Sequence, residues 1–62
     1  MTFISAVLEY KDFPGCYYCD SQIGYTTKLF VAEMYTSVEK AEEARSRLKN
    51  SKDLIVREIY IK

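Results

Sequence analysis

Two cysteines separated by two residues, Cys16 and Cys19, come nearest to a chemical site in this chain. A structural zinc ion needs four ligands, usually thiolates and imidazoles. The chain has no histidine, so it offers these two thiolates with Asp12 and Asp20 as weaker donors. Two such loops brought together would supply four thiolates. The motif therefore predicts a zinc site only as a bridge between two chains.

Other interpretations of the cysteine pair stay open. A redox pair needs the motif at the N-terminus of a helix, where the dipole lowers the thiol pKa. Here Pro14 and Gly15 precede the pair and polar residues follow, which indicates a loop. Ordinary reduced loop thiols are the interpretation that a lone motif favours, ahead of a shared metal and a disulfide. We expect no cofactor in a single chain.

Three glutamates, Glu9, Glu33 and Glu58, fall one on each predicted strand. Their spacing would allow general acid–base chemistry, but catalysis also needs a concave and water-poor pocket. A three-stranded sheet with one helix offers little depth, and acidic side chains are mostly exposed. Nucleophilic catalysis by a cysteine lacks a histidine to activate it. We therefore predict that the protein is not an enzyme.

The element that organises the chain is an apolar run that leads into a capped helix, over residues 28–50. Thr36 and Glu39 have the spacing of a capping box, so a helix is expected from about Ser37. A stripe at three- and four-residue steps predicts one narrow buried face, made of Val38, Ala41, Ala44 and Leu48. Charged residues occupy the opposite side of this helix.

Three segments have the composition of strands, at residues 2–10, 25–35 and 54–61. The first is apolar on both faces, which suits a central strand. The sequence therefore predicts an α+β fold of the ββαβ type, with a three-stranded antiparallel or mixed sheet in the order 2-1-3 and one helix on one face. A long loop over residues 11–24 joins the first two strands. A shorter loop, with a longer hairpin paired through Tyr17 and Tyr18, is the alternative.

This topology leaves the side of the sheet away from the helix uncovered. Alternation in the third strand assigns Ile55, Arg57, Ile59 and Ile61 to the helix side. The uncovered side then carries Phe3, Val7, Leu29, Val31, Tyr35, Leu54, Val56 and Tyr60, with Glu9, Glu33 and Glu58. An exposed apolar patch of this kind usually marks an interaction surface. Different strand registers, or a loop folded back over the sheet, would remove the patch.

Size and charge narrow the classes of partner. The 62 residues form one domain, over 1–62, whose small core would gain stability from a second subunit. Nine basic and nine acidic residues cancel, which argues against nucleic acid as a partner. A membrane partner is not expected either, because the chain has no apolar run long enough to span a bilayer. The expected location is the cytoplasm.

We therefore predict a small protein-binding module that forms a homodimer or binds another protein. The expected contact residues are Glu9, Tyr17, Tyr18, Leu29, Val31, Glu33, Tyr35, Val56, Glu58 and Tyr60. Free strand edges offer a second route, by pairing of the strand at residues 25–35 with its copy or with an extended peptide. A zinc-bridged dimer through Cys16 and Cys19, and a nucleic-acid-binding module, are the alternatives. In size and charge the chain is similar to small phage-encoded proteins that bind and inhibit host factors, a resemblance that involves no motif.

Overall fold

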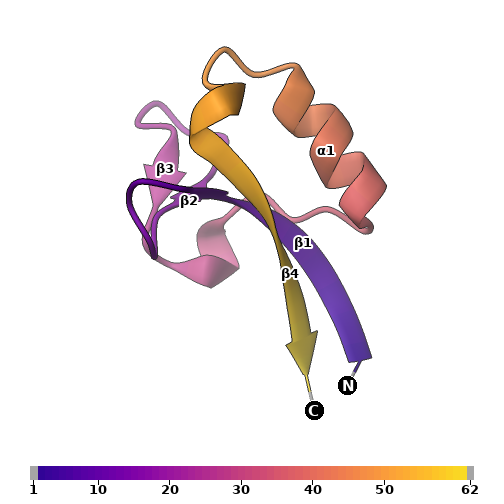
Figure 1. Cartoon of the computed structure of the whole chain (residues 1–62). Helices are drawn as coiled ribbons and strands as arrows, with labels where there is room; N and C mark the ends of the chain where they lie inside the picture. Colours follow the sequence, from indigo (N-terminus) through magenta and orange to yellow (C-terminus); the bar gives the residue numbers. More distant parts are fainter. Residues whose placement is uncertain (1, 62) are drawn as a thin grey trace.

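The computed structural model describes residues 2–61, which form a small α+β domain. Its elements in chain order are β1 (Thr2–Tyr10), β2 (Tyr17–Tyr18), β3 (Tyr25–Thr26), the 3₁₀ turn η1 (Leu29–Val31), α1 (Val38–Ser46), the 3₁₀ turn η2 (Ser51–Asp53) and β4 (Leu54–Ile61). Within these residues the strands form one four-stranded antiparallel sheet in the order β3-β2-β1-β4. Figure 1 shows β1 and β4 crossing the molecule together, with α1 on one side of them.

The predicted central position of the first strand is confirmed. β1 pairs antiparallel with β4 along most of its length and with β2 at Glu9 and Tyr17. Its middle residues are apolar on both faces, and Ala6, Val7 and Leu8 are all fully buried. A strand with this composition is stable only where both faces are covered, which explains its place inside the sheet.

The predicted continuous second strand at residues 25–35, and with it the three-stranded sheet, is wrong, although parts of this segment do lie on the side of β1 away from β4, as the predicted order 2-1-3 requires. Tyr25 and Thr26 pair with β2, Leu29–Val31 form η1, and of the remainder Tyr35 makes an isolated bridge to Ala6. The alternative pairing through Tyr17 and Tyr18 is confirmed.

The cause of this difference is local hydrogen bonding before β2 and after β3. Two successive turns close the loop after β1, with Phe13 N donating to Tyr10 O and Cys16 N donating to Phe13 O. Gly15 permits the second turn because its φ is +90°. The chain therefore returns to β1 by Tyr17. After β3, the backbone N–H of Lys28 donates to the Thr26 hydroxyl, a local bond that competes with strand pairing.

The helix begins where the sequence predicts, but its cap lies one residue later than the predicted capping box. Ser37, not Thr36, accepts the backbone N–H of Lys40 at 3.2 Å. The narrow buried face is confirmed: Ala41 is fully buried, and Val38, Ala44 and Leu48 are half-buried. A small residue at its centre lets α1 lie close to the sheet.

The core lies between α1 and one side of the sheet. Its buried centre is Ala6, Leu8, Ala41 and Leu54, and the side chains packed around it are Phe3, Tyr10, Tyr18, Tyr35, Leu48 and Val56. Leu8 pairs with Val56 and Tyr10 pairs with Leu54, so the even-numbered residues of β4 face the helix. The opposite assignment made from the sequence is wrong. Ile55, on the other face, is 42% exposed.

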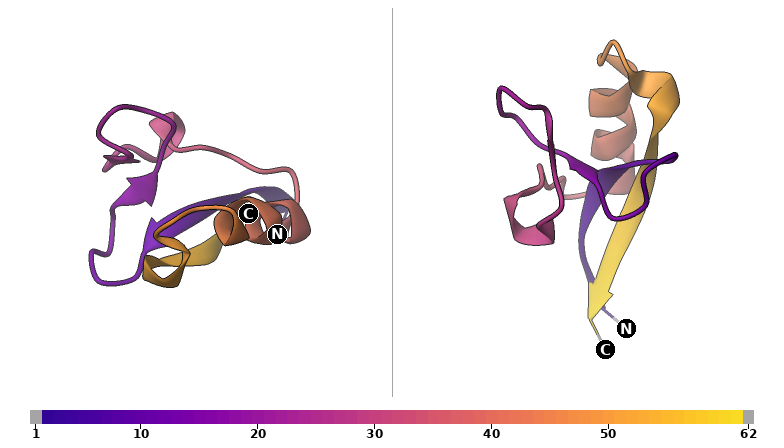
Figure 2. Two further views of the ribbon diagram at one scale, coloured as in Figure 1. Left: turned by 90° about the horizontal axis from the view of Figure 1, so that it is seen from above. Right: turned by 90° about the vertical axis from the view of Figure 1, so that its left-hand side faces the viewer.

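The side of the sheet away from α1 is also largely covered, in contrast to the prediction. Ser5, Val7 and Glu9 point to that side and are buried, and Val7 has 0% exposure. Figures 1 and 2 show α1 on one side of β1 and the segment that carries η1 on the other. The chain's own excursion after β2 therefore shelters the face that was expected to be open. The exposed large apolar residues of the sheet are Ile55, Tyr60 and Ile61 on β4, Ile4 on β1 and Tyr25 on β3.

Candidate protein-binding groove

The strand β4 is a long free edge of the sheet. It contains eight residues, and no strand within residues 2–61 pairs with its outer side. Native proteins usually protect such an edge with proline, charged side chains (especially lysine), a bulge or a covering element. β4 has no proline or lysine, its charged residues are Arg57, which is paired with Glu9, and Glu58, and the irregularity in its ladder with β1 lies between Phe3 and Ser5 on the partner strand. Its backbone is therefore open to pairing.

The hydrogen bonds of Ala6 show which β4 residues offer that backbone. Ala6 exchanges both of its backbone hydrogen bonds with Tyr35, at 2.9 and 2.8 Å, on the side of β1 away from β4. In an antiparallel ladder the partner of such a residue also turns its N–H and C=O outward. The partner on β4 is Glu58. Alternation then places the outward backbone groups on Val56, Glu58 and Tyr60.

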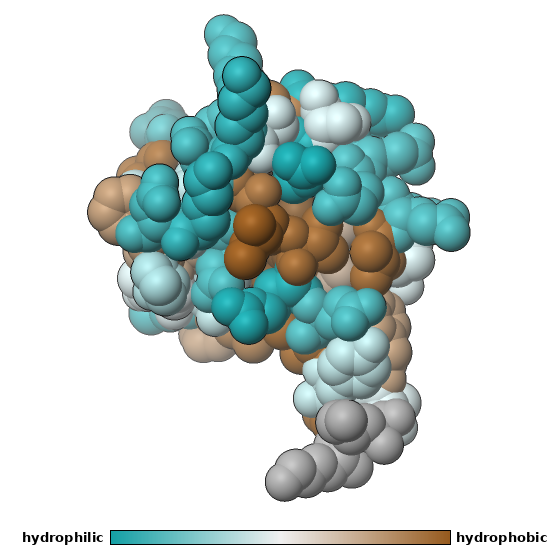
Figure 3. All heavy atoms as spheres, viewed as in Figure 1, coloured by the Kyte–Doolittle hydropathy of each residue, from teal (hydrophilic) through white to brown (hydrophobic). Residues whose placement is uncertain are grey.

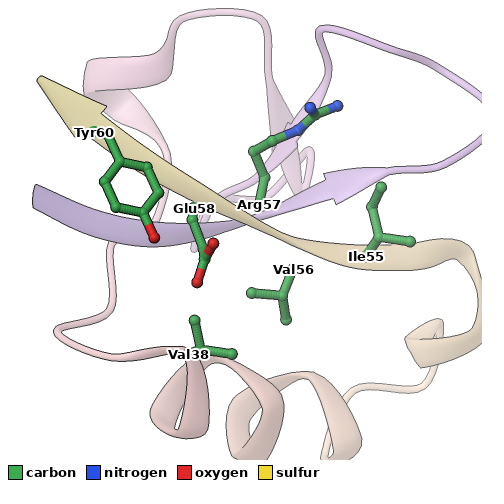
Figure 4. Close-up of a pocket in the computed structure, with 6 residues that line it drawn as sticks. All are labelled: Val38, Ile55, Val56, Arg57, Glu58 and Tyr60. Carbon is green, nitrogen blue, oxygen red and sulfur yellow. The ribbon is translucent and has the colours of Figure 1, made fainter. Parts of the chain in front are cut away.

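The side chains of the same three residues line a groove beside the edge. Val56, Glu58 and Tyr60 lie on the helix side of β4, and Val38 of α1 faces them across a cavity of about 420 Å³ (Figure 4). Figure 3 shows hydrophobic atoms at the surface between β4 and α1. Open backbone groups and an apolar groove therefore occur together.

Glu58 gives the groove its charge. It takes part in none of the ion pairs formed between residues 2–61. Its hydrogen bond with Tyr60 raises the pKa of that phenol above its usual value, with burial and the carboxylate charge acting in the same direction. Arg57 does not neutralise Glu58, because its side chain points to the opposite side of β4 (Figure 4). The groove is therefore apolar with one acidic group.

On that opposite side, Arg57 binds the buried Glu9. The guanidinium donates from Nε to Glu9 Oε1 at 3.0 Å and also from Nη2, while the backbone N–H of Gly15 donates to Oε2 at 3.0 Å. Burial alone would raise the pKa of Glu9. The hydrogen bonds from Arg57 and Gly15, with the charge of Arg57, outweigh burial and bring the pKa below its usual value. One carboxylate therefore ties the loop after β1 and the strand β4 to the centre of the sheet.

This arrangement predicts a loss of stability in acid. A carboxyl group whose pKa is lower in the folded state stabilises the protein above its unfolded pKa of about 4.3, and this contribution disappears as the pH falls through the folded value. We expect the free energy of unfolding, measured by urea denaturation, to fall below about pH 4.5. Glu9→Gln should weaken this dependence. Arg57→Met should lower the free energy of unfolding at neutral pH, because it leaves the buried Glu9 carboxylate without its cationic partner. An unchanged acid dependence in Glu9→Gln would assign the titration to other carboxyl groups.

Of the ten contact residues predicted from the sequence, the structure brings Val56, Glu58 and Tyr60 together. The others are dispersed. Tyr18 and Tyr35 pack against the core, Glu9 is buried on the other side of the sheet, and Tyr17 pairs with Glu9. Leu29, Val31 and Glu33 lie in or after η1. Sequence reasoning missed Val38 as a groove residue, because its place in the helix stripe indicated burial alone.

The two cysteines are free thiols in different surroundings. Cys19 is 5% exposed and its sulfur lies 3.2 Å from the Ser21 hydroxyl oxygen. Cys16 is half-buried and lines a separate cavity. Within residues 2–61 no three acidic or thiol side chains are grouped to hold a metal ion. A zinc site shared by two chains stays a prediction, and it requires the loop to open and expose Cys19.

Comparison with known proteins gives no relative: no family model, curated protein or solved structure matches this chain. No helix within residues 2–61 has the length and apolar character that crossing a membrane requires.

Proposed function

We propose that this protein is a small binding module that takes up an extended segment of a partner protein as a further antiparallel strand on β4. The observation that carries this proposal is the coincidence at Val56, Glu58 and Tyr60 of outward backbone groups with side chains that line the groove. Strand addition uses both features, since main-chain hydrogen bonds supply affinity and pockets for alternate side chains supply specificity. Binding, without catalysis, is the proposed activity.

The groove defines the partner's chemistry. Residues directly opposite in an antiparallel pair share one face, so alternate residues of the added strand would enter the groove. Val56 and Tyr60 favour apolar side chains, and Glu58 favours a lysine or arginine opposite it. The proposed ligand is therefore an extended segment of about five residues. Its first and last residues are apolar, and its central residue is lysine or arginine, so that these three alternate side chains enter the groove.

A second copy of this chain is a poorer ligand for the edge. Two copies of β4 paired antiparallel are related by an axis perpendicular to the sheet, so residues of the same parity must face each other. The two registers with the longest overlap then place Arg57 opposite Arg57 or Glu58 opposite Glu58. Like charges directly opposite each other destabilise a pair of strands. This favours a different protein over the homodimer expected from the sequence.

Selection from a random peptide library displayed against the purified protein tests the proposal. The wild-type protein should enrich peptides with alternating apolar residues and one basic residue. Glu58→Lys should select an acidic residue at the same position, because the charge in the groove is reversed. A basic consensus that survives Glu58→Lys, or enriched peptides without alternation, would place the binding surface elsewhere.

Sedimentation of the purified protein tests the competing homodimer. We expect a monomer at the concentrations that saturate peptide binding. The two registers with the longest overlap of two β4 strands place Arg57 opposite Arg57 or Glu58 opposite Glu58, and such pairs of like charges are destabilising. A stable dimer that dissociates in Glu58→Pro would instead assign the edge to a second copy.

A further inference from the structure

A second cavity, of about 400 Å³, has walls that are mainly aromatic. It is lined by Tyr10, Phe13, Cys16 and Tyr25. These residues come from the end of β1, the loop after it and β3, so three separate segments contribute one ring each. An adjoining cavity of about 260 Å³ is also lined by Tyr10 and Phe13, together with Asp12 and Asp53.

Hydrogen bonds hold this aromatic cavity in place. The Tyr10 hydroxyl donates to Gly24 O at 3.0 Å and accepts from Asn50 Nδ2 at 3.1 Å, which fixes the ring between β3 and the segment after α1. In the two turns of the loop, the backbone N–H of Phe13 donates to Tyr10 O at 3.1 Å and that of Cys16 donates to Phe13 O at 3.0 Å. Tyr25 is set by its pairing with Tyr18. The Tyr10 ring and the backbone that carries Phe13, Cys16 and Tyr25 are therefore held in place before a ligand enters.

The charge around the two cavities has one sign. Asp12 and Asp53 are their charged lining residues, and neither carboxylate forms an ion pair between residues 2–61. Lys11 follows Tyr10 in the chain but lines neither cavity. Its backbone N–H donates to Asp53 O at 2.9 Å, which joins the loop to η2. A ligand in the aromatic cavity would thus be surrounded by three aromatic side chains, with two carboxylates that form no ion pair lining the adjoining cavity.

We propose that this cavity binds a quaternary ammonium group. Aromatic faces attract a cation through the ring quadrupole, and methyl groups on the nitrogen give it an apolar surface that matches the walls. An unmethylated ammonium is compact and strongly hydrated, so it would lose more hydration on entry. A neutral group of the same shape would gain nothing from the rings' charge distribution or from Asp12 and Asp53. Both the charge and the methyl groups are therefore required.

Titration of the ¹⁵N-labelled protein by NMR separates these requirements. Choline and tetramethylammonium should shift the amide signals of Phe13, Cys16 and Tyr25 with saturable curves. The neutral isostere 3,3-dimethylbutan-1-ol and the unmethylated ammonium ion should each bind at least about fivefold more weakly. Equal or tighter binding of the neutral isostere would show a simple apolar pocket and overturn the proposal. An absence of shifts with choline and tetramethylammonium would also overturn it.

Matched variants assign the binding to the cavity. Phe13→Leu and Tyr25→Leu should each weaken choline binding by about three- to tenfold, since each removes one aromatic wall. Phe30→Leu is the control, because Phe30 is 79% exposed, belongs to η1 and lines neither cavity. Asp53→Asn should weaken choline by about two- to fourfold and leave the neutral isostere unaffected. Phe13 and Tyr25 are largely exposed, so both variants should keep the wild-type spectrum elsewhere. If Phe30→Leu weakens binding as much as Phe13→Leu, the assignment fails.

The quaternary ammonium group could belong to a modified protein or to a free small molecule, and the same assay distinguishes the two. A peptide that carries trimethyllysine and free choline present the same cation, and the tighter ligand identifies a modified protein or a small molecule as the source. Cavity binding and β4-edge binding are separable, because Glu58→Pro should weaken peptide binding at the edge at least about tenfold and leave choline binding unchanged. If Glu58→Pro loses choline binding, or if Phe13→Leu loses peptide binding, the two sites are not separate.

Discussion

Proline in place of Glu58 should weaken peptide binding at least about tenfold and leave the protein folded, whereas proline at the next residue, Ile59, should strongly destabilise it. The backbone N–H of Glu58 points away from β1, so its loss removes no bond of the β1–β4 ladder. By alternation, the N–H of Ile59 points toward Ser5. A proline there removes a ladder bond and places the ring against β1, which should cost a large part of the total stability. A domain of this size has roughly 3–9 kcal/mol in total.

Circular dichroism, thermal denaturation and peptide titration measure the two parts of this prediction. Glu58→Ala is the control, because it removes the carboxylate but keeps the N–H. It should bind the selected peptide a few-fold more weakly, while Glu58→Pro should lose at least about tenfold, the equivalent of one or two hydrogen bonds. If Ile59→Pro folds as well as Glu58→Pro, the orientation of the backbone groups along β4 is wrong. If Glu58→Pro binds as Glu58→Ala does, the edge is not the binding surface.

The second large effect is expected from Val7→Ala, which should reduce the free energy of unfolding by about 2 kcal/mol. Val7 points away from α1 and is nevertheless fully buried, so its truncation removes two methyl-sized groups and leaves a cavity. Val31→Ala is the matched control. Val31 is 49% exposed, and its truncation should change stability by less than about 0.5 kcal/mol.

Urea denaturation of both variants and the wild type gives their free energies of unfolding, with one common dependence on urea concentration used for all three. Equal values for Val7→Ala and Val31→Ala would mean that the side of the sheet away from α1 is open, as the sequence alone predicts. That result would restore a sheet-face interface. A large cost for Val7→Ala alone confirms that the segment after β2 covers this side.

Parts of the fold could be predicted because their signals are local. Ala6, Val7 and Leu8 are apolar on both faces of one strand, which indicates a central position without knowledge of its neighbours. A hydroxyl just before an amphipathic run locates the start of α1 to within one residue, since capping depends on a few adjacent residues. The segment at residues 54–61 is recognisable for its β-branched and aromatic content.

The predicted second strand is wrong because the strand propensity of its residues did not decide their conformation; the tertiary contacts around them did. Leu29, Phe30 and Val31 have high strand propensity, yet they form η1. The position on β1 that they would have paired with is partly taken by β2, because the preceding loop returns early. Strand propensity reports how well a side chain fits a pleated surface, and it is not an independent backbone preference.

The three groove residues of β4, Val56, Glu58 and Tyr60, could not be assigned to a face from the β4 sequence alone. Leu54, Val56 and Tyr60 form one apolar set, and Ile55, Ile59 and Ile61 form another, so alternation does not distinguish the buried side. The register against β1 decides it, because Leu8 faces Ala41 of the helix and draws Val56 to the same side. A shift by one residue would have exchanged the two sets.

The sequence by itself determined a central apolar strand, a capped helix with one narrow buried face and a final strand, because neighbouring residues specify each of these. Only the tertiary structure decided which edge is free, which β4 residues line the groove, and that Tyr10, Phe13 and Tyr25 surround one cavity. The physical reason is that these sites join residues far apart in the chain, such as Val38 with Glu58. Their proximity depends on turn geometry and strand register, which local composition does not specify.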